Sequence, residues 1–161
     1  MGKFVKLQSL KDKKLKKPVV LTGGAFDFLH LGQAEYLKKC KGFGKTLIVQ
    51  VASDRYVKLK KGRDRPVNTA KHRATLLSYL EFVDYVFVSD KRCESKFVID
   101  IIKPDILILS DENKSEKLNF LKMNLNEKQI KKLNLKFISR VLFADGISTT
   151  RIIEKIKNRR S

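Results

Sequence analysis

Four short, almost continuously apolar runs restrict the fold of this sequence more than any other feature. They cover residues 19–23, 46–52, 85–88 and 106–109. A strand with one face in water alternates apolar and polar residues, whereas a strand covered on both faces can be apolar throughout. The four runs therefore predict buried strands of a parallel sheet.

Segments with the character of helices separate these runs. We expect helices at residues 32–41, 69–80, 96–102 and 148–156, two helical pieces within 113–132, a short helix near Ser9 and a late strand at 135–138. Strands that alternate with helices indicate an α/β fold. The expected architecture is a Rossmann-like, doubly wound parallel sheet of about five strands, with helices on both faces.

The length of 161 residues suits one domain with a substantial core. We expect a basic lead-in at residues 1–17 and a single domain over residues 18–161. No run of 18 apolar residues predicts a membrane span, and the start of the chain lacks the apolar segment of a signal peptide. Because Cys40 and Cys93 match no metal-binding or redox spacing, free thiols and a cytoplasmic location are expected.

The net charge is +19, since 36 Lys and Arg face 17 Asp and Glu. Such a charge attracts anions in general, including phosphorylated small molecules. The basic residues are spread widely, although seven lysines lie within residues 3–17. Specific nucleic-acid binding is therefore not expected, and the lysines of the lead-in keep it as an alternative.

The first apolar run ends in Gly23 and Gly24, and a helix is expected to begin a few residues later. In open α/β sheets, ligands bind at the carboxyl ends of strands. Glycines let the backbone approach a bulky anion, and a helix N-terminus favours phosphate. His30 and Gln33 share one face there, and both can donate to phosphate oxygens. The simpler alternative is a His that caps its own helix beside a surface Gln.

A second segment rich in cations covers residues 60–73. It carries Lys60, Lys61, Arg63 and Arg65 on a Gly-containing loop, with Arg73 on the next helix. A mobile cationic loop can close over a polyphosphate. The alternative is a solvated basic loop with no ligand.

A third segment, residues 145–152, contains a Gly turn before another helix start. Ser148 is placed to cap this helix, and Thr149, Thr150 and Arg151 follow it. Hydroxyl groups and an Arg at a helix N-terminus again suit phosphate. The alternative is an ordinary capped helix.

Together the three segments resemble the nucleotidyltransferases of the cytidylyltransferase-like superfamily. That family combines a G-x-F-D-x-x-H-x-G-H motif, a Lys-containing loop before R-P-V, and an I-S-T-T helix. The corresponding residues here are 24–33, 65–67 and 147–150, and the resemblance covers about residues 15–157. The R-P-V-N loop and the D-G-x-S-T-T helix are most similar to the heptose-1-phosphate adenylyltransferase domain of ADP-heptose synthesis. Residues 110–112 and 119–122 are also similar to glycerol-3-phosphate cytidylyltransferase.

The resemblance implies transfer of a nucleoside monophosphate to a sugar- or polyol-phosphate, with release of pyrophosphate. It favours ATP over CTP as the donor, implies Mg²⁺ bound with the triphosphate, and allows a homodimer. By resemblance, His30 holds the phosphates at the reacting centre, Gln33 assists it, and Lys61 is the mobile-loop lysine. It further assigns nucleotide contacts to Thr22, Gly23, Gly24, Ala25, Phe26, Gly32, Arg73, Asp111, Ser148, Thr149 and Thr150. Asp27 is expected to order its loop, and no residue is assigned to hold a metal by itself.

Gln33 is the one departure from the first motif, because the family has a second His there. Gln keeps a donor of similar reach but can never carry a positive charge. Three interpretations follow: a slower enzyme, an enzyme compensated by its lysines, or a degenerate domain that binds nucleotide without turnover.

Overall fold

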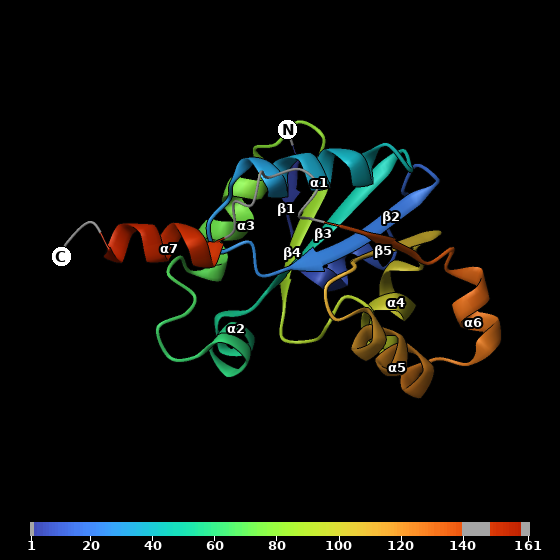
Figure 1. Ribbon diagram of the computed structural model, residues 1–161. Helices are drawn as coiled ribbons and strands as arrows, with labels where there is room; N and C mark the ends of the chain where they lie inside the picture. Colours follow the sequence, from blue (N-terminus) through green and yellow to red (C-terminus); the bar gives the residue numbers. More distant parts are fainter. Residues whose placement is uncertain (1, 140–148, 159–161) are drawn as a thin grey trace.

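A six-stranded parallel sheet forms the centre of the computed structural model, which describes residues 2–139 and 149–158 (Figure 1). Its strands are β1 (Lys3–Phe4), β2 (Val19–Gly24), β3 (Thr46–Ala52), β4 (Tyr85–Ser89), β5 (Ile106–Ser110) and β6 (Lys136–Ile138). They lie in the order β1-β4-β3-β2-β5-β6. The predicted fold class is confirmed, but the sheet has six strands rather than about five.

The additional strand is β1, which comes from the basic lead-in. It pairs in parallel with β4, with Lys3 opposite Tyr85 and Phe4 opposite Val86. A strand of two residues is too short to show any periodicity in the sequence. The lead-in continues into a short 3-10 helix, η1 (Leu7–Leu10), and Leu10 is only 1% exposed. Residues 3–10 therefore pack onto the sheet.

The α-helices connect the strands and cover both faces of the sheet. They are α1 (Leu31–Lys41), α2 (Asp54–Lys61), α3 (Ala70–Ser78), α4 (Lys96–Ile102), α5 (Lys114–Asn124), α6 (Glu127–Lys132) and α7 (Thr149–Lys157). Figure 1 shows α1 above the sheet and α4 and α5 below it.

Strand β2 illustrates why both faces must be covered. Successive side chains of a strand point to opposite faces. Val19 and Leu21 pack with residues of η1, α4 and α5, whereas Val20 packs with residues of α1 and α3. The continuous apolar run is therefore buried on both sides, as expected for a doubly wound sheet.

Helix α2 was not among the predicted helices. The Ser53 side chain caps it by accepting from the Tyr56 N–H, and Gly62, with a φ of 95°, follows its last residue. The positive φ favours glycine and ends the helix at Lys61. Lys60 and Lys61, which were expected on a loop, consequently lie on the last turn of α2.

The functional site lies where successive strands change from one side of β2 to the other. From β2 the chain adds β3 and β4 on one side, then returns past β2 to place β5 on its other side. This topological switch leaves a crevice at the carboxyl ends of β2 and β5, where open α/β sheets bind ligands. Gly23 and Gly24 end β2 at this crevice.

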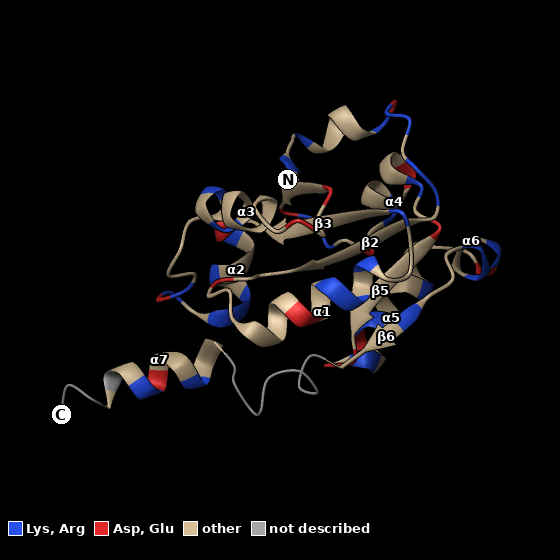
Figure 2. Ribbon diagram, turned by 90° about the horizontal axis from the view of Figure 1, so that it is seen from above, with Lys and Arg blue, Asp and Glu red and all other residues tan. Residues whose placement is uncertain are grey.

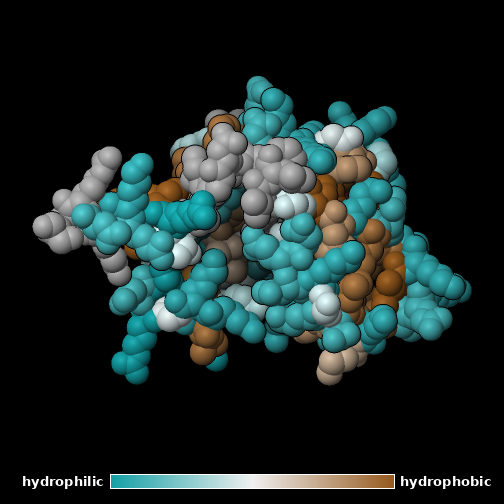
Figure 3. Space-filling view, in the orientation of Figure 1, coloured by the Kyte–Doolittle hydropathy of each residue, from teal (hydrophilic) through white to brown (hydrophobic). Residues whose placement is uncertain are grey.

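Charged residues occupy much of the surface around this frame. Figure 2 shows Lys and Arg on α1, α2, α5 and α6 and along the N-terminal segment. Most of the face drawn in Figure 3 is hydrophilic. In the part of the chain that the structure describes, we find no helix with the length and apolar character needed to cross a membrane.

Candidate functional site

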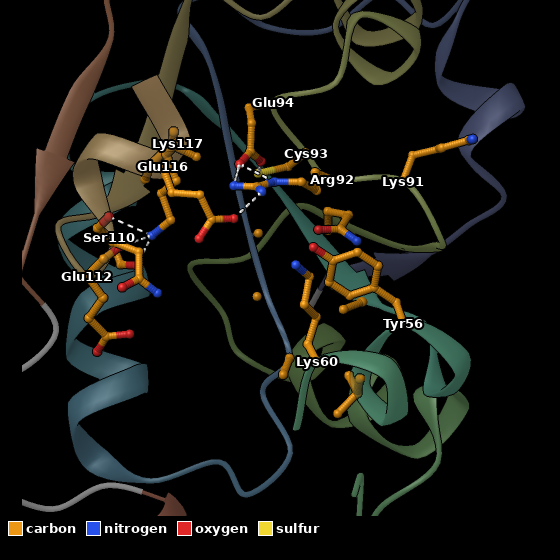
Figure 4. Close-up of a pocket in the computed structure, with 18 of the residues that line it drawn as sticks. Tyr56, Lys60, Lys91, Arg92, Cys93, Glu94, Ser110, Glu112, Glu116 and Lys117 are labelled. Atoms are coloured by element: carbon orange, nitrogen blue, oxygen red, sulfur yellow. Dashed lines mark hydrogen bonds and ion pairs between the residues drawn. The ribbon is translucent and has the colours of Figure 1, made fainter. Parts of the chain in front are cut away.

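A cavity of about 330 Å³ lies at the carboxyl ends of β2, β3 and β5 (Figure 4). Five parts of the chain contribute to it: the end of β2, the end of β3, helix α2, the loop after β4, and the region from the end of β5 into α5. Among its lining residues are Gly23, Gly24, Ala25, Gln50, Tyr56, Lys60, Lys61, Arg92, Cys93, Glu94, Ser110, Glu116 and Lys117. The predicted residues Gly23, Gly24, Ala25 and Lys61 thus share one cavity.

The end of β2 is narrow, and only a glycine fits at residue 23. A Cβ atom there would lie 2.5 Å from Gln50 Oε1 and 2.9 Å from both Cβ and Sγ of Cys93. These distances are shorter than van der Waals contact, so a side chain would push into the cavity wall. The glycine therefore keeps the strand end open to a ligand.

The loop after β2 is held by the carboxylate of Asp27, whose side chain is only 1% exposed. Asp27 accepts hydrogen bonds from Arg65 Nε at 2.7 Å and from the N–H groups of Val67 and Asn68 at 2.9 Å. Burial would raise the pKa of Asp27, but these three hydrogen bonds outweigh it and hold the pKa below its ordinary value. Asp27 therefore orders the loop after β2, and its contacts join the first motif to the R-P-V-N loop.

Arg73 supports the same loop from α3. Its Nε donates to Asn68 O at 2.9 Å, its Nη1 donates to Ala25 O, and its Nη2 pairs with Asp54 Oδ1 at 2.7 Å. The side chain is 1% exposed and is not part of the cavity wall. The sequence predicts Arg73 in a triphosphate cradle, whereas in the structure its guanidinium is bound to protein groups.

His30 and Gln33 stand at the start of α1. The His30 backbone O accepts from Gln33 N at 2.9 Å, but its imidazole makes no capping hydrogen bond. Gln33 is only 8% exposed, and its Oε1 has no hydrogen-bond partner among the described residues. In the simpler alternative, His30 caps its own helix and Gln33 lies on the surface. His30 is indeed the N-cap residue of α1, but without a side-chain hydrogen bond, and Gln33 is buried.

The remaining predicted residues take several positions. Thr22 is fully buried and shares a 2.8 Å hydrogen bond with the Tyr36 hydroxyl, and Phe26 is part of the core. Gly32 lies in the first turn of α1. Asp111 is exposed just after β5, outside the cavity wall.

The third motif is only partly visible in the structure. Ser148 and the Gly turn before it lie outside the described residues. Thr149 and Thr150 begin α7, with Thr149 buried and Thr150 exposed. Their relation to phosphate stays a prediction.

The cavity also contains charged groups that no sequence motif indicated. Arg92 pairs with Glu94 at 2.6 Å and with Glu116 at 2.8 Å (Figure 4). Lys117 Nζ donates to Ser110 O at 2.8 Å and to Ser110 Oγ at 2.6 Å. These residues follow the ends of β4 and β5, so the position of charges after apolar runs was the signal that could have found them.

Helix α2 contributes an amphipathic wall opposite Arg92. Tyr56 and Lys60 lie across the cavity from the Arg92 cluster (Figure 4). Burial raises the pKa of the Tyr56 hydroxyl, so this group is neutral at physiological pH and can donate a hydrogen bond. The cavity thus contains cationic groups and a neutral hydroxyl beside the carboxylates of Glu94 and Glu116, and its cations and hydroxyl suit a phosphorylated and hydroxylated ligand.

Comparison with known proteins finds a matching family and curated relatives. Residues 21–155 match the family described as Cytidylyltransferase-like. Among curated proteins, the chain is 39% identical over 145 residues to "Bifunctional protein HldE" of a Nitratiruptor species, which covers 90% of the chain and 29% of that protein. It is 39% identical over 155 residues to the protein of the same name from Helicobacter pylori, and this match covers 96% of the chain and 31% of that protein. The chain therefore spans about 30% of the length of these curated relatives.

Solved structures share the fold. A lipopolysaccharide core biosynthesis protein from Thermoplasma volcanium is 31% identical, with a TM-score of 0.61, and the match covers 75% of this chain and 95% of that one. A pantothenate synthetase from Thermus thermophilus is 11% identical, with a TM-score of 0.55 over 84% and 60% of the two chains, and this likeness concerns the fold alone. With the glycine-rich end of β2 at the carboxyl edge of the sheet and its match over residues 21–155, the chain belongs to the cytidylyltransferase-like family of nucleotidyltransferases.

Proposed function

We propose that this chain transfers AMP from ATP to the phosphate group of a sugar phosphate. The observation that carries the proposal is the cavity at the switch point, which joins the glycine-rich end of β2 to a wall containing Lys60, Lys61 and Arg92. The similarity to the two HldE proteins and the R-P-V-N and S-T-T motifs support a heptose 1-phosphate as acceptor.

The reaction is an in-line displacement at phosphorus. An oxygen of the acceptor phosphate attacks the α-phosphorus of ATP, the bond from that phosphorus to the bridging oxygen breaks, and pyrophosphate leaves with the bond's electrons. No covalent enzyme intermediate is needed, so the protein positions the reactants and stabilises charge.

In this proposal the described residues act on the phosphates at different points. His30 donates to the phosphate oxygens beside the start of α1, and Gln33 adds a neutral donor through its amide. Lys61, at the end of α2, neutralises negative charge on the α- and β-phosphates. Asp27 and Arg73 hold the loop of Gly24 and Ala25 in the shape that admits the triphosphate.

Mg²⁺ fits this site as a partner of the triphosphate. Asp27 has its carboxylate engaged by three donors, and residues 2–139 and 149–158 contain no cluster of three or more His, Cys, Asp or Glu side chains that could hold a metal. Magnesium in such sites is bound mainly by substrate phosphates and water, and it supplies charge neutralisation there.

Pyrophosphate release tests the proposal directly. ATP and CTP are each incubated with heptose 1-phosphate and with glycerol 3-phosphate, and release is expected with ATP and heptose 1-phosphate. His30→Ala should lower the rate at least about 100-fold. His72→Ala is the matched control, because this second histidine is exposed on α3, and it should leave the rate unchanged. Release with CTP and glycerol 3-phosphate would replace the donor and acceptor named here, and no release with any pair would overturn the proposal.

A binding module without turnover is the second candidate. The buried, neutral Gln33 favours it, because this position cannot supply the charge of a second histidine. Calorimetry that finds nucleotide binding, together with an assay that finds no pyrophosphate, would support this candidate over the first.

A further inference from the structure

Arg92 is held in a fixed position inside the cavity. Its Nε and Nη2 contact Glu94 Oε1 at 2.7 and 2.6 Å, and its Nη1 donates to Glu116 Oε1 at 2.8 Å. The guanidinium also lies over the Phe120 ring, 4.5 Å from the ring centre. A planar cationic group is thus already oriented before any ligand binds.

The two carboxylates that contact Arg92 differ in their surroundings. The Glu94 side chain is 5% exposed and also accepts from Cys93 Sγ at 3.3 Å. Moving Glu94 away would leave a buried charge unpaired, which is costly. The Glu116 side chain is 56% exposed, so it can move into water at little cost.

The charges on this cluster persist at neutral pH. Burial alone would lower the pKa of the Arg92 guanidinium, but the Glu94 carboxylate raises it and keeps the group cationic. The hydrogen bond from Arg92 lowers the pKa of Glu116, which therefore remains an anion near pH 7. One edge of the Arg92 guanidinium is accordingly held by the buried carboxylate of Glu94, and the other by the exposed carboxylate of Glu116, which can be exchanged for a ligand.

We propose that Arg92 binds the phosphate group of the acceptor, and that Glu116 occupies this edge of the guanidinium until the phosphate replaces it. This proposal rests on the function proposed above and names a residue for its second substrate. A phosphate monoester carries more negative charge than a carboxylate and offers three acceptor oxygens to the Arg fork. It therefore competes effectively with a single exposed carboxylate.

The position of Arg92 agrees with this role. It lines the same cavity of about 330 Å³ as Gly23 and Gly24, so a phosphate bound to it shares the space at the end of β2 where the triphosphate is proposed to lie. Lys60 lies across the cavity (Figure 4), and its charge also favours an anion there. Glu94 acts through Arg92, since it fixes the orientation of the guanidinium.

Two substitutions should have opposite effects. Arg92→Gln is expected to raise the KM for heptose 1-phosphate at least about tenfold while the KM for ATP changes less than about twofold. Glu116→Gln removes the competing charge and is expected to lower the KM for heptose 1-phosphate by about threefold or more. Asp100→Asn is the matched control, because Asp100 is also an exposed carboxylate in an ion pair, with Lys96, but lies on α4 outside the cavity wall. It should change neither KM.

If the ion pair between Arg92 and Glu116 were purely structural, removal of either partner would weaken the same contact. Both substitutions would then change the KM for the acceptor in the same direction. A KM for the acceptor that rises in both Arg92→Gln and Glu116→Gln, or that changes in neither, would overturn the proposal. Should Arg92→Gln fail to fold, Glu116→Gln decides alone: a lower KM supports the exchange, and an unchanged or higher KM refutes it.

Phosphate binding separates this proposal from the proposed function. Inorganic phosphate is titrated by calorimetry with α,β-methylene-ATP present, so that the nucleotide site is filled. Affinity should fall at least about tenfold in Arg92→Gln, rise in Glu116→Gln and stay unchanged in Asp100→Asn. If no acceptor is turned over but these shifts occur, the reaction is wrong and the phosphate site is right. Equal phosphate affinity in all four proteins would exclude the site even in an active enzyme.

Discussion

Gln33 is the residue at which this chain departs from its family's first motif. It is buried at the start of α1, and its Oε1 has no hydrogen-bond partner among the described residues. A polar atom left in this state is costly, so a site that tolerates it is under functional constraint or awaits a ligand. A triphosphate cannot donate to Oε1, so Gln33 would have to present its amide nitrogen to the ligand.

We predict that Gln33→His raises the rate of pyrophosphate release by about tenfold or more, because a histidine at this position can become a charged donor to the leaving group. Steady-state assays at pH 6.5 and 8 measure the effect, and the gain should be larger at pH 6.5, where the new imidazole is more often protonated. Gln33→Ala serves as the control and should only lower the rate. A Gln33→His protein with an unchanged rate would show that charge at this position is unimportant.

Asp27 links two motifs through one carboxylate, and its removal should affect stability. We predict that Asp27→Asn lowers the free energy of unfolding by about 2–4 kcal/mol at pH 7, because the amide presents a donor to groups that are donors themselves. Urea unfolding at several pH values measures this loss.

The pH dependence follows from the direction of the pKa shift. The folded pKa of Asp27 is lowered from its ordinary value near 3.8, so its contribution is present above that value and is lost as the pH falls through the folded pKa. The difference between wild type and Asp27→Asn should therefore shrink as the pH falls below about 4. Asp12→Asn, which changes an exposed acid in the lead-in, is the control and should cost little at any pH. A difference that stays constant down to pH 2.5 would contradict the assigned role.

At the scale of elements, the N-terminal segment is bound to the domain by apolar contacts as well as by strand pairing. Leu10 is 1% exposed and packs with Val19, Leu21 and Phe87 of the core. We predict that Leu10→Ala lowers the free energy of unfolding by about 2–4 kcal/mol, in a single cooperative transition. Lys11→Ala, at the exposed neighbouring position, should cost less than about 0.5 kcal/mol. If Leu10→Ala costs no more than Lys11→Ala, the segment is an appendage rather than part of the cooperative unit.

Elements with enough residues to show a periodicity could be predicted from the sequence. The apolar runs at β2, β3, β4 and β5 fell within a residue of their observed ends, since burial on both faces leaves a clear pattern. Strand β1 has two residues and left no pattern, and helix α2 combines lysines with a single buried residue, Val57. Helix α2 is specified by its caps, Ser53 and Gly62, more than by an apolar face.

The same distinction applies to the site. Local motifs indicated Gly23, Gly24, Ala25 and Lys61, because each belongs to a short stretch with its own chemistry. Arg92 and Glu116 are 24 residues apart, and their pairing depends on the way α5 packs beside the loop after β4. The charges after the apolar runs point to each residue separately, but no local pattern encodes their contact, so the pairing of Arg92 with Glu116 could be found only in the folded chain.

For the whole molecule, the net charge of +19 should govern how the protein meets its substrates. A strongly positive protein attracts a triphosphate over distances comparable to the Debye length, which is about 10 Å at 0.1 M salt. We predict that the KM for ATP rises severalfold when the ionic strength increases from about 20 to about 300 mM. Equal ionic strengths set with sodium chloride and with potassium acetate should give the same rise. A KM that does not depend on salt would contradict long-range attraction.

The place of β2 between β3 and β5 also has a consequence for the order of folding. Val20 of β2 lies opposite Ile106 of β5. One wall of the crevice therefore forms only after the chain has passed through β3 and β4 and returned to pair β5 with β2. Pairings between residues so far apart in sequence form slowly, because loop closure must precede the gain from contact. A chain emerging from the ribosome can pair β2 with β3 early, yet it has no cavity until β5 is available. Formation of the cavity therefore depends on the pairing of β5 with β2, and a fragment that ends before residue 106 cannot form it.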